Sequence, residues 1–259
     1  MFRFFSNFKS KKKYTLVISG WWVRWFYALG ILKWLEELWL DKNIEAIYWV
    51  SAWAIVASYR AAGYSAGYIF DSFLNFWLTS SINLLPKKSL FKHDKLIEKF
   101  WLDLPDTFEN LYKKVYIGCT DIKTSEYILF EKWNLIKPLL GSMSIPWVFS
   151  HIDYDKYSLA DGWLVNNFPV DIARKQYPKN QIIWIFLNYF NTNQEVKSFY
   201  GSLNVAFEIL LRSQALKNLK FVDHLFYRKL DIWVLETNKK KTKALFDQWY
   251  RDCIEHFKK

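Results

Sequence analysis

The chain has 259 residues, two cysteines and a net charge of +11, from 36 basic and 25 acidic residues. Its length predicts a single domain, residues 1–259, whose core is large enough to need no disulfides. The widely spaced cysteines predict a reducing, cytoplasmic environment and no metal site, and no apolar run reaches the ~20 residues of a membrane-spanning helix.

The positive charge predicts an anionic partner. Lysine runs at residues 11–13 and 239–241 are read either as solvated tails or as a peripheral contact with anionic lipid at the inner membrane face. Nucleic acid is not expected, because no aromatic and basic array resembles a nucleic-acid module once the tryptophans are discounted.

Strand and helix patterns alternate in the first quarter of the chain. Residues 14–18 form an apolar, partly β-branched run and residues 44–48 a second one. Helical spacing of apolar residues follows each strand, at 26–40 and at 52–62. Two strand-to-helix turns are therefore predicted, the first at residues 20–25 and the second around Ser51.

The rest of the chain continues this alternation. Residues 68–110 are predicted to be a helical insertion, and residues 188–259 a mainly helical part with a strand at 230–235. Between them we predict strands at 115–121, 127–130 and 181–187, and helices at 135–143 and 170–176. The fold class is α/β, a three-layer α/β/α sandwich with a mainly parallel central sheet and a catalytic region at about 14–187.

Tryptophan is unusually common and glycine unusually rare in this chain, which has fifteen of the first and eight of the second. Glycine makes up about 3 % where ~7 % is usual, and counting the tryptophans as glycine would give about 9 %. Several tryptophans occupy positions where catalytic turns need a residue without a side chain. Trp21, Trp22 and Trp25 follow Gly20, Trp49 and Trp53 flank Ser51, and Trp163 follows Asp161 and Gly162.

We interpret these tryptophans as glycines written with the wrong decoding table, since the codon UGA encodes tryptophan in some genetic codes and glycine in others. Trp39, Trp133 and Trp147 also stand in helix-end or turn contexts that favour glycine. The alternative is a protein with genuine tryptophans at a membrane interface. Positive φ and close approach at Trp21, Trp22, Trp25, Trp49 and Trp53 would then cost roughly 5–10 kcal/mol, so the literal sequence is predicted to be impaired.

Four ordered motifs appear when the tryptophans are read as glycine. They are G-G-G-x-R-G at residues 20–25, G-x-S-x-G at 49–53, S-I-P-G at 144–147, and D-G-G at 161–163 with Asn166-Asn167-Phe168-Pro169 after it. In this order and spacing they resemble the patatin-like phospholipase family (patatin domain), from about residue 14 to residue 169. The resemblance implies a lipid acyl hydrolase with a lipid or phospholipid substrate, no cofactor and no metal.

The resemblance also implies roles for individual residues. Ser51 matches the nucleophile and Asp161 the base that accepts its proton, with no histidine between them. The nucleophile elbow would comprise Trp49, Val50, Ala52 and Trp53, and the D-G-G motif includes Gly162 and Trp163. The oxyanion hole would be built by Gly20, Trp21, Trp22, Val23, Arg24 and Trp25, with Trp21 and Trp22 as backbone donors. Arg24 would fix the loop by hydrogen bonds or, as the alternative, contact a lipid phosphate.

Two other interpretations are kept open. An α/β-hydrolase with a Ser-His-Asp triad would need a late histidine, such as His224 or His256. A non-catalytic nucleotide-binding module would use the G-x-G-x-x-G spacing of positions 20, 22 and 25, with Asp41 or Glu45 as its acidic residue. Neither alternative explains the D-G-G motif.

Overall fold

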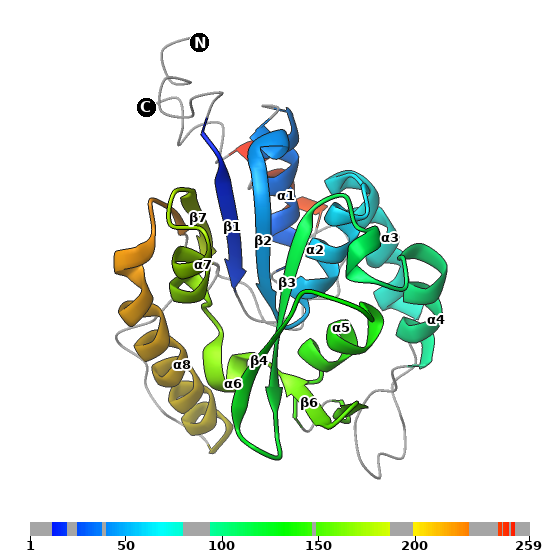
Figure 1. The fold of residues 1–259 in the computed structure, drawn as a ribbon, viewed down its shortest axis with the longest axis vertical. Coiled ribbons are helices and arrows are strands. Elements are labelled where there is room, and N and C mark those ends of the chain that lie inside the picture. The colour runs from blue at the N-terminus through cyan, green and yellow to red at the C-terminus, as the bar shows by residue number, and fades with distance from the viewer. Residues whose placement is uncertain are drawn as a thin grey trace.

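A computed structural model of the chain has three layers, with a twisted central sheet between two sets of helices (Figure 1). The described residues are 12–19, 25–37, 40–79, 94–146, 149–186, 199–227, 243–244, 246–248 and 250–251. Gly20 to Arg24, the two lysine runs, His256 and the predicted strand at 230–235 lie outside the described residues, apart from Lys12 and Lys13.

The central sheet is mainly parallel. Its described strands run in the order β5-β6-β3-β2-β1-β7-β8, with β4 also paired to β3. The five strands β3, β2, β1, β7 and β8 are parallel neighbours, whereas β4, β5 and β6 are antiparallel additions at one side. The strands are β1 Tyr14–Ser19, β2 Ile44–Val50, β3 Lys114–Asp121, β4 Glu126–Phe130, β5 Ile152–Tyr154, β6 Tyr157–Asp161, β7 Gln181–Phe186 and β8 His224–Tyr227.

Helices cover both faces of the sheet. The α-helices are α1 Trp25–Glu37, α2 Trp53–Ala61, α3 Ala66–Thr79, α4 Asp94–Asp103, α5 Ile136–Ser142, α6 Trp163–Asn166, α7 Val170–Gln176 and α8 Phe199–Asn218. Short 3-10 turns are η3 Leu40–Asn43, η4 Phe108–Asn110 and η5 Leu219–Phe221. Among the described helices, none has the length and apolar character that crossing a bilayer requires.

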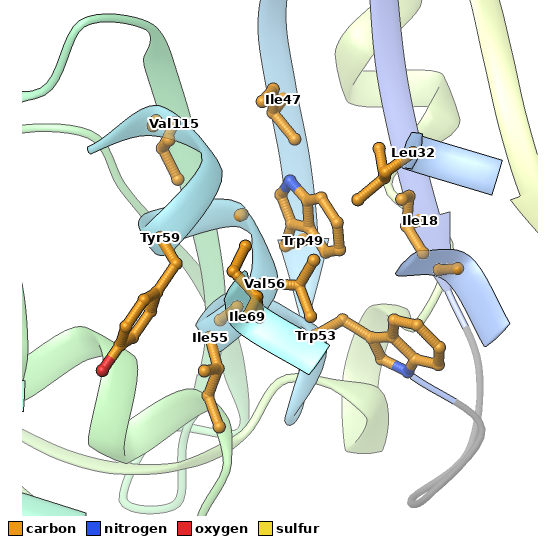
Figure 2. Close-up of a cluster of buried hydrophobic side chains, with 14 of the residues drawn as sticks. Ile18, Leu32, Ile47, Trp49, Trp53, Ile55, Val56, Tyr59, Ile69 and Val115 are labelled. Carbon is orange, nitrogen blue, oxygen red and sulfur yellow. The ribbon is translucent and has the colours of Figure 1, made fainter. Parts of the chain in front are cut away.

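Successive side chains of the central strands point to opposite faces of the sheet, and an apolar core forms on each face. Leu16 and Ile18 of β1 face the layer of α1, α2, α3 and α5, whereas Val17 faces the layer of α6, α7 and α8. Figure 2 shows the first core, in which Trp49 and Trp53 pack among Ile18, Leu32 and Val56. Because the central strands are buried on both faces, their sequences are nearly continuous apolar runs.

The predicted α/β/α sandwich is confirmed, and so are the strands near 14–18, 44–48, 115–121, 127–130 and 181–187. The described parts of the predicted insertion at 68–110 carry α3 and α4. The antiparallel hairpin of β5 and β6 was not predicted, although it ends at Asp161. The division of the chain into regions stays a prediction.

Candidate active site

Ser51 lies in a tight turn between a strand and a helix. It follows Val50, the last residue of β2, and its carbonyl accepts the Ala54 N–H at 2.9 Å in the first turn of α2. Its φ is +69°, a left-handed conformation that is uncommon outside glycine. The turn is therefore a strained one, of the kind that the surrounding structure must hold in place.

Asp161 reaches Ser51 because of the pairing of β3. On β3, Gly118 pairs with Val50 of β2, and the next residue, Cys119, pairs with Asp161 of β6. At these residues β4 pairs with the other side of β3, so β2 and β6 pair with the same side of β3. Strand β6 therefore lies in line with β2, just past the last residue of β2. The last residue of β6 thus meets the turn that follows the last residue of β2.

One glycine permits this close approach, and a second makes room for a neighbouring tyrosine. A Cβ on Gly162 would lie 2.5 Å from the Gly118 carbonyl oxygen and 3.0 Å from Val50 Cγ1. A Cβ on Gly118 would lie 1.9 Å from the hydroxyl oxygen of Tyr127 on β4. Neither position has room for a side chain. Gly162 lets the backbone after Asp161 rest directly on β3, and Gly118 leaves space for Tyr127.

The Asp161 carboxyl group is fully buried. Burial raises its pKa to about 8, while hydrogen bonding with the Ser51 side chain and with the Trp163 N–H acts in the opposite direction. Oδ1 accepts the Trp163 N–H at 3.2 Å, whereas Oδ2 has no partner among the described residues that meets hydrogen-bond geometry. Burial also raises the pKa of Cys119 and that of Tyr127 well above their ordinary values, so both neighbours are neutral near pH 8.

The other predicted site residues divide into two groups. Trp49 and Val50 end β2, Ala52 and Trp53 enter α2, and Gly162 and Trp163 start α6. Of the predicted oxyanion loop, the residues from Gly20 to Arg24 lie outside the described residues, and Trp25 is the first residue of α1. Because Ile18 of β1 pairs with Trp49 of β2, the strand that leads to this loop ends beside the Ser51 turn.

The expectation of backbone strain at the elbow tryptophans is wrong in part. Trp49 lies in a regular strand and Trp53 in a helix, so neither has positive φ, and their side chains pack in the core beneath α1 and α2. The positive φ in this turn belongs to Ser51. Among the described tryptophans, Trp133 is the one with positive φ, +63°, and its side chain is 74 % exposed.

The described residues of the two alternative interpretations lie away from the Ser51 turn, whereas His256 and positions 20 and 22 lie outside the described residues. His224 is the first residue of β8 and its Nε2 lies 2.9 Å from Oε1 of Gln181, the first residue of β7. It therefore lies at the N-terminal ends of the parallel strands, whereas Ser51 follows the C-terminal end of β2. Asp41 and Glu45 also lie at the N-terminal end of the strands, just before and within the start of β2, where they pair with Arg60 and Lys13. The described residues contain no cluster of three or more side chains suited to a metal ion.

Two contacts of the site were not predicted from the sequence. Ser142, at the end of α5, accepts a hydrogen bond from the Ser51 N–H. Thr120 on β3 donates its hydroxyl to the Asp161 carbonyl at 2.9 Å. These contacts join positions 91 and 41 residues apart, so no local pattern could have predicted them.

The patatin-like phospholipase family model matches residues 16–174, more than half of the chain. The chain belongs to this family, and as a member it is a lipid acyl hydrolase. A curated relative, "Probable lipid hydrolase 463L" of Invertebrate iridescent virus 6, is 26 % identical over 231 residues, 77 % of this chain and 79 % of the relative.

Two solved structures show the same fold. VipD from Legionella pneumophila has a TM-score of 0.50 at 13 % identity, covering 92 % of this chain and 67 % of VipD. The type III effector ExoU of Pseudomonas aeruginosa has a TM-score of 0.51 at 13 % identity, covering 94 % of this chain and 52 % of that one. The chain therefore spans about half the length of the ExoU structure.

Proposed function

We propose that this patatin-like protein cleaves acyl esters of lipids through a dyad of Ser51 and Asp161. The observation that carries the proposal is the pairing of consecutive β3 residues with Val50 and Asp161, which brings a strained serine to a buried carboxyl group. A serine hydroxyl becomes a useful nucleophile when a neighbouring base takes its proton. Asp161 is the carboxylate placed to do so, with no imidazole between them.

The reaction proceeds in two halves. Ser51 Oγ attacks the acyl carbon while its proton passes to Asp161, and the tetrahedral intermediate collapses to an acyl-enzyme as the alcohol leaves with that proton. Water then attacks the acyl-enzyme, giving a proton to Asp161, and the fatty acid leaves as the proton returns to Ser51 Oγ. Because a pKa of about 8 lies near neutral pH, Asp161 can both accept and return the proton.

The oxyanion of each tetrahedral intermediate needs backbone donors that are already in place. We assign this role to the loop of residues 20–25, with the N–H groups of Trp21 and Trp22 as donors and Arg24 as the residue that holds the loop. The position of Ser19 and Trp25 supports the assignment, since β1 ends beside the Ser51 turn and α1 begins at Trp25.

We also infer that the tryptophans of the motifs stand for glycine. Trp133 supports this, because φ of +63° is a glycine-type conformation and its indole is largely exposed. The indole N–H groups of Trp49 and Trp53 are buried with no hydrogen-bond partner in the described part of the chain, and an orphaned buried donor costs about 1–3 kcal/mol. The gene tests the idea directly: UGA at the fifteen tryptophan codons supports it, and UGG at position 53 contradicts it.

A peripheral contact with an anionic lipid surface is the third part of the proposal. Helix α8 exposes Ile209, Leu210 and Leu216, and Lys217 and Lys220 are exposed near them. The helix lies on the same side of the sheet as α6, which starts directly after the dyad aspartate (Figure 1). Apolar side chains among basic ones favour the surface of an anionic bilayer.

Labelling with a fluorophosphonate probe and hydrolysis of a phospholipid ester test the dyad. Both are measured on the chain as written and on a form with glycine at the fifteen tryptophan positions, and equal activity of the two forms would contradict the decoding. In the active form, Ser51→Ala is expected to abolish labelling and turnover. His224→Ala, the matched control, is expected to keep both, and its loss of activity would favour a triad instead.

A further inference from the structure

A short segment at the end of α5 contacts the backbones of both dyad residues. Ser142 Oγ accepts the Ser51 N–H at 2.9 Å and donates its own hydrogen to the Gly118 carbonyl at 2.7 Å. Both serines are buried, with exposures of 0 % and 3 %. The Ser142 hydroxyl therefore links β3 to the strained turn that carries Ser51, with its donor and an acceptor lone pair both used.

The same segment also holds Asp161. Two residues after Ser142, the carbonyl of Ser144 accepts the Asp161 N–H at 3.0 Å. The Ser144 hydroxyl donates to the Leu140 carbonyl at 2.7 Å, which fixes the segment to the last turn of α5. Residues 142–144 thus contact one dyad residue at each end.

These contacts have a consequence for the chemistry. The Ser51 N–H already donates to Ser142, so it is not available to an oxyanion, whose donors must come from other backbone groups. The bond instead acts on the position of Ser51, whose φ of +69° is maintained by its surroundings. Buried hydrogen bonds of this kind restrict a turn to one geometry.

We infer that Ser142 is a positioning residue for the dyad, and that the segment of residues 142–144 sets the approach of Ser51 Oγ to the Asp161 carboxyl group. The inference rests on the proposed function. It does not require Ser142 to touch the substrate. Removing its hydroxyl leaves the Ser51 N–H and the Gly118 carbonyl without their partner in a fully buried place, and the turn is expected to shift away from Asp161.

Loss of positioning is expected to lower kcat and leave KM nearly unchanged. A misplacement of about 1 Å costs ~100-fold in rate, so Ser142→Ala is expected to lose 10- to 100-fold in kcat.

The pH profile of Ser142→Ala should move as well. Hydrogen bonding with Ser51 lowers the pKa of Asp161, so weakening it shifts the acidic limb of kcat/KM to higher pH. The described titratable groups that face Asp161, Cys119 on β3 and Tyr127 on β4, stay neutral in this range.

The experiment uses whichever form of the chain is active, with tryptophan or with glycine at the fifteen positions, and this form is called wild type. It is compared with its Ser142→Ala, Ser142→Cys and Ser158→Ala variants in reducing buffer. Alanine removes the γ atom, whereas cysteine keeps one that is somewhat larger than oxygen and only a weak hydrogen-bond donor and acceptor, so the two variants together separate bonding from packing. Ser158 is a buried serine on β6 whose hydroxyl donates to Asp153, away from the dyad, and its variant is expected to keep the wild-type kcat and pH profile. Thermal unfolding of each variant shows how much of it is folded.

The expected result is a reduced kcat with a shifted acidic limb for both Ser142 variants, after correction for the folded fraction. Wild-type kcat and an unmoved pH profile in either folded Ser142 variant would overturn the inference. A lower rate with an unmoved pH profile would also overturn it. Such a result would mean that Ser142 supports the folding of the active protein without changing how Ser51 contacts Asp161. Failure of the proposed function is a separate result, since wild type itself would then show no Ser51 labelling.

Discussion

The ionised form of the Asp161 carboxyl group is needed by the proposed mechanism but lowers the stability of the fold. Full burial raises its pKa to about 8, and no described basic side chain is among the groups that shift it. The protonated form is therefore the one that the folded protein accommodates, whereas the ionised form is the one that the proposed mechanism requires. Replacing the carboxyl group should change stability and activity in opposite directions.

Asp161→Asn is expected to abolish turnover and to stabilise the fold. The pKa of an unfolded aspartate is about 3.9, so between about pH 4 and pH 8 the folded state holds a proton that the unfolded state has lost. The stability of wild type should fall as pH rises through this window and level off above about 8. Removing the carboxyl group removes this loss, which amounts to several kcal/mol at ~1.4 kcal/mol per pH unit.

Denaturant unfolding of wild type and Asp161→Asn at pH 5 and pH 9 measures the effect. The difference in free energy of unfolding between the two proteins should grow with pH. A difference that stays constant between these pH values would show that the aspartate has an ordinary pKa and is not the buried base.

Trp133 gives a second test at the level of one residue. A tryptophan at φ +63° is strained by about 1–2 kcal/mol, and its exposed indole returns little in packing. Trp133→Gly is therefore expected to raise the free energy of unfolding by about 1 kcal/mol. The matched control is Trp101→Gly: Trp101 is 54 % exposed but lies within helix α4, where glycine is expected to destabilise. Equal losses in both variants would argue for a genuine tryptophan at 133.

At the scale of elements, the contact between β3 and the start of α6 determines whether Asp161 can face Ser51. Gly162→Ala places a Cβ 2.5 Å from the Gly118 carbonyl oxygen, and the backbone after Asp161 must move away to accept it. We expect a loss of more than tenfold in kcat together with a lower melting temperature. Gly67→Ala in α3 is the control, since its Cβ would lie 4.0 Å from the Ser65 hydroxyl oxygen and alanine favours a helix. Unchanged turnover in Gly162→Ala would mean that this close contact does not position the dyad.

The same elements show what the sequence could and could not predict. Apolar runs such as residues 14–18 and 44–48 indicated the buried parallel strands, because a strand covered on both faces needs no polar alternation. The hairpin of β5 and β6 was missed because its first strand, Ile152–Tyr154, has three residues and a half-exposed pattern. The Ser51 turn was predicted from its motif, whereas the Ser142 contact depends on how α5 packs against the turn.

At the scale of the whole molecule, the positive charge and the exposed apolar residues of α8 bear on how a lipid substrate is reached. Exposed fractions of 61 % for Ile209 and 55 % for both Leu210 and Leu216 are large for apolar side chains on one helix. The net charge of +11 adds a general attraction to anionic surfaces, which salt weakens. Binding to vesicles should therefore depend both on these three residues and on ionic strength.

Replacing Ile209, Leu210 and Leu216 together by serine is expected to weaken binding to phosphatidylserine vesicles by at least about tenfold, because three apolar side chains no longer enter the interface. Wild type should bind neutral phosphatidylcholine vesicles more weakly, and its binding to the anionic vesicles should fall as salt is raised from about 0.1 M to 0.5 M. Leu102→Ser on α4 provides the matched control, since Leu102 is 80 % exposed on the other helical layer. Vesicle sedimentation that is equal for wild type and the triple variant would place the membrane contact elsewhere. Hydrolysis of a soluble short-chain ester should be the same in both proteins, because α8 contributes no residue to the proposed dyad.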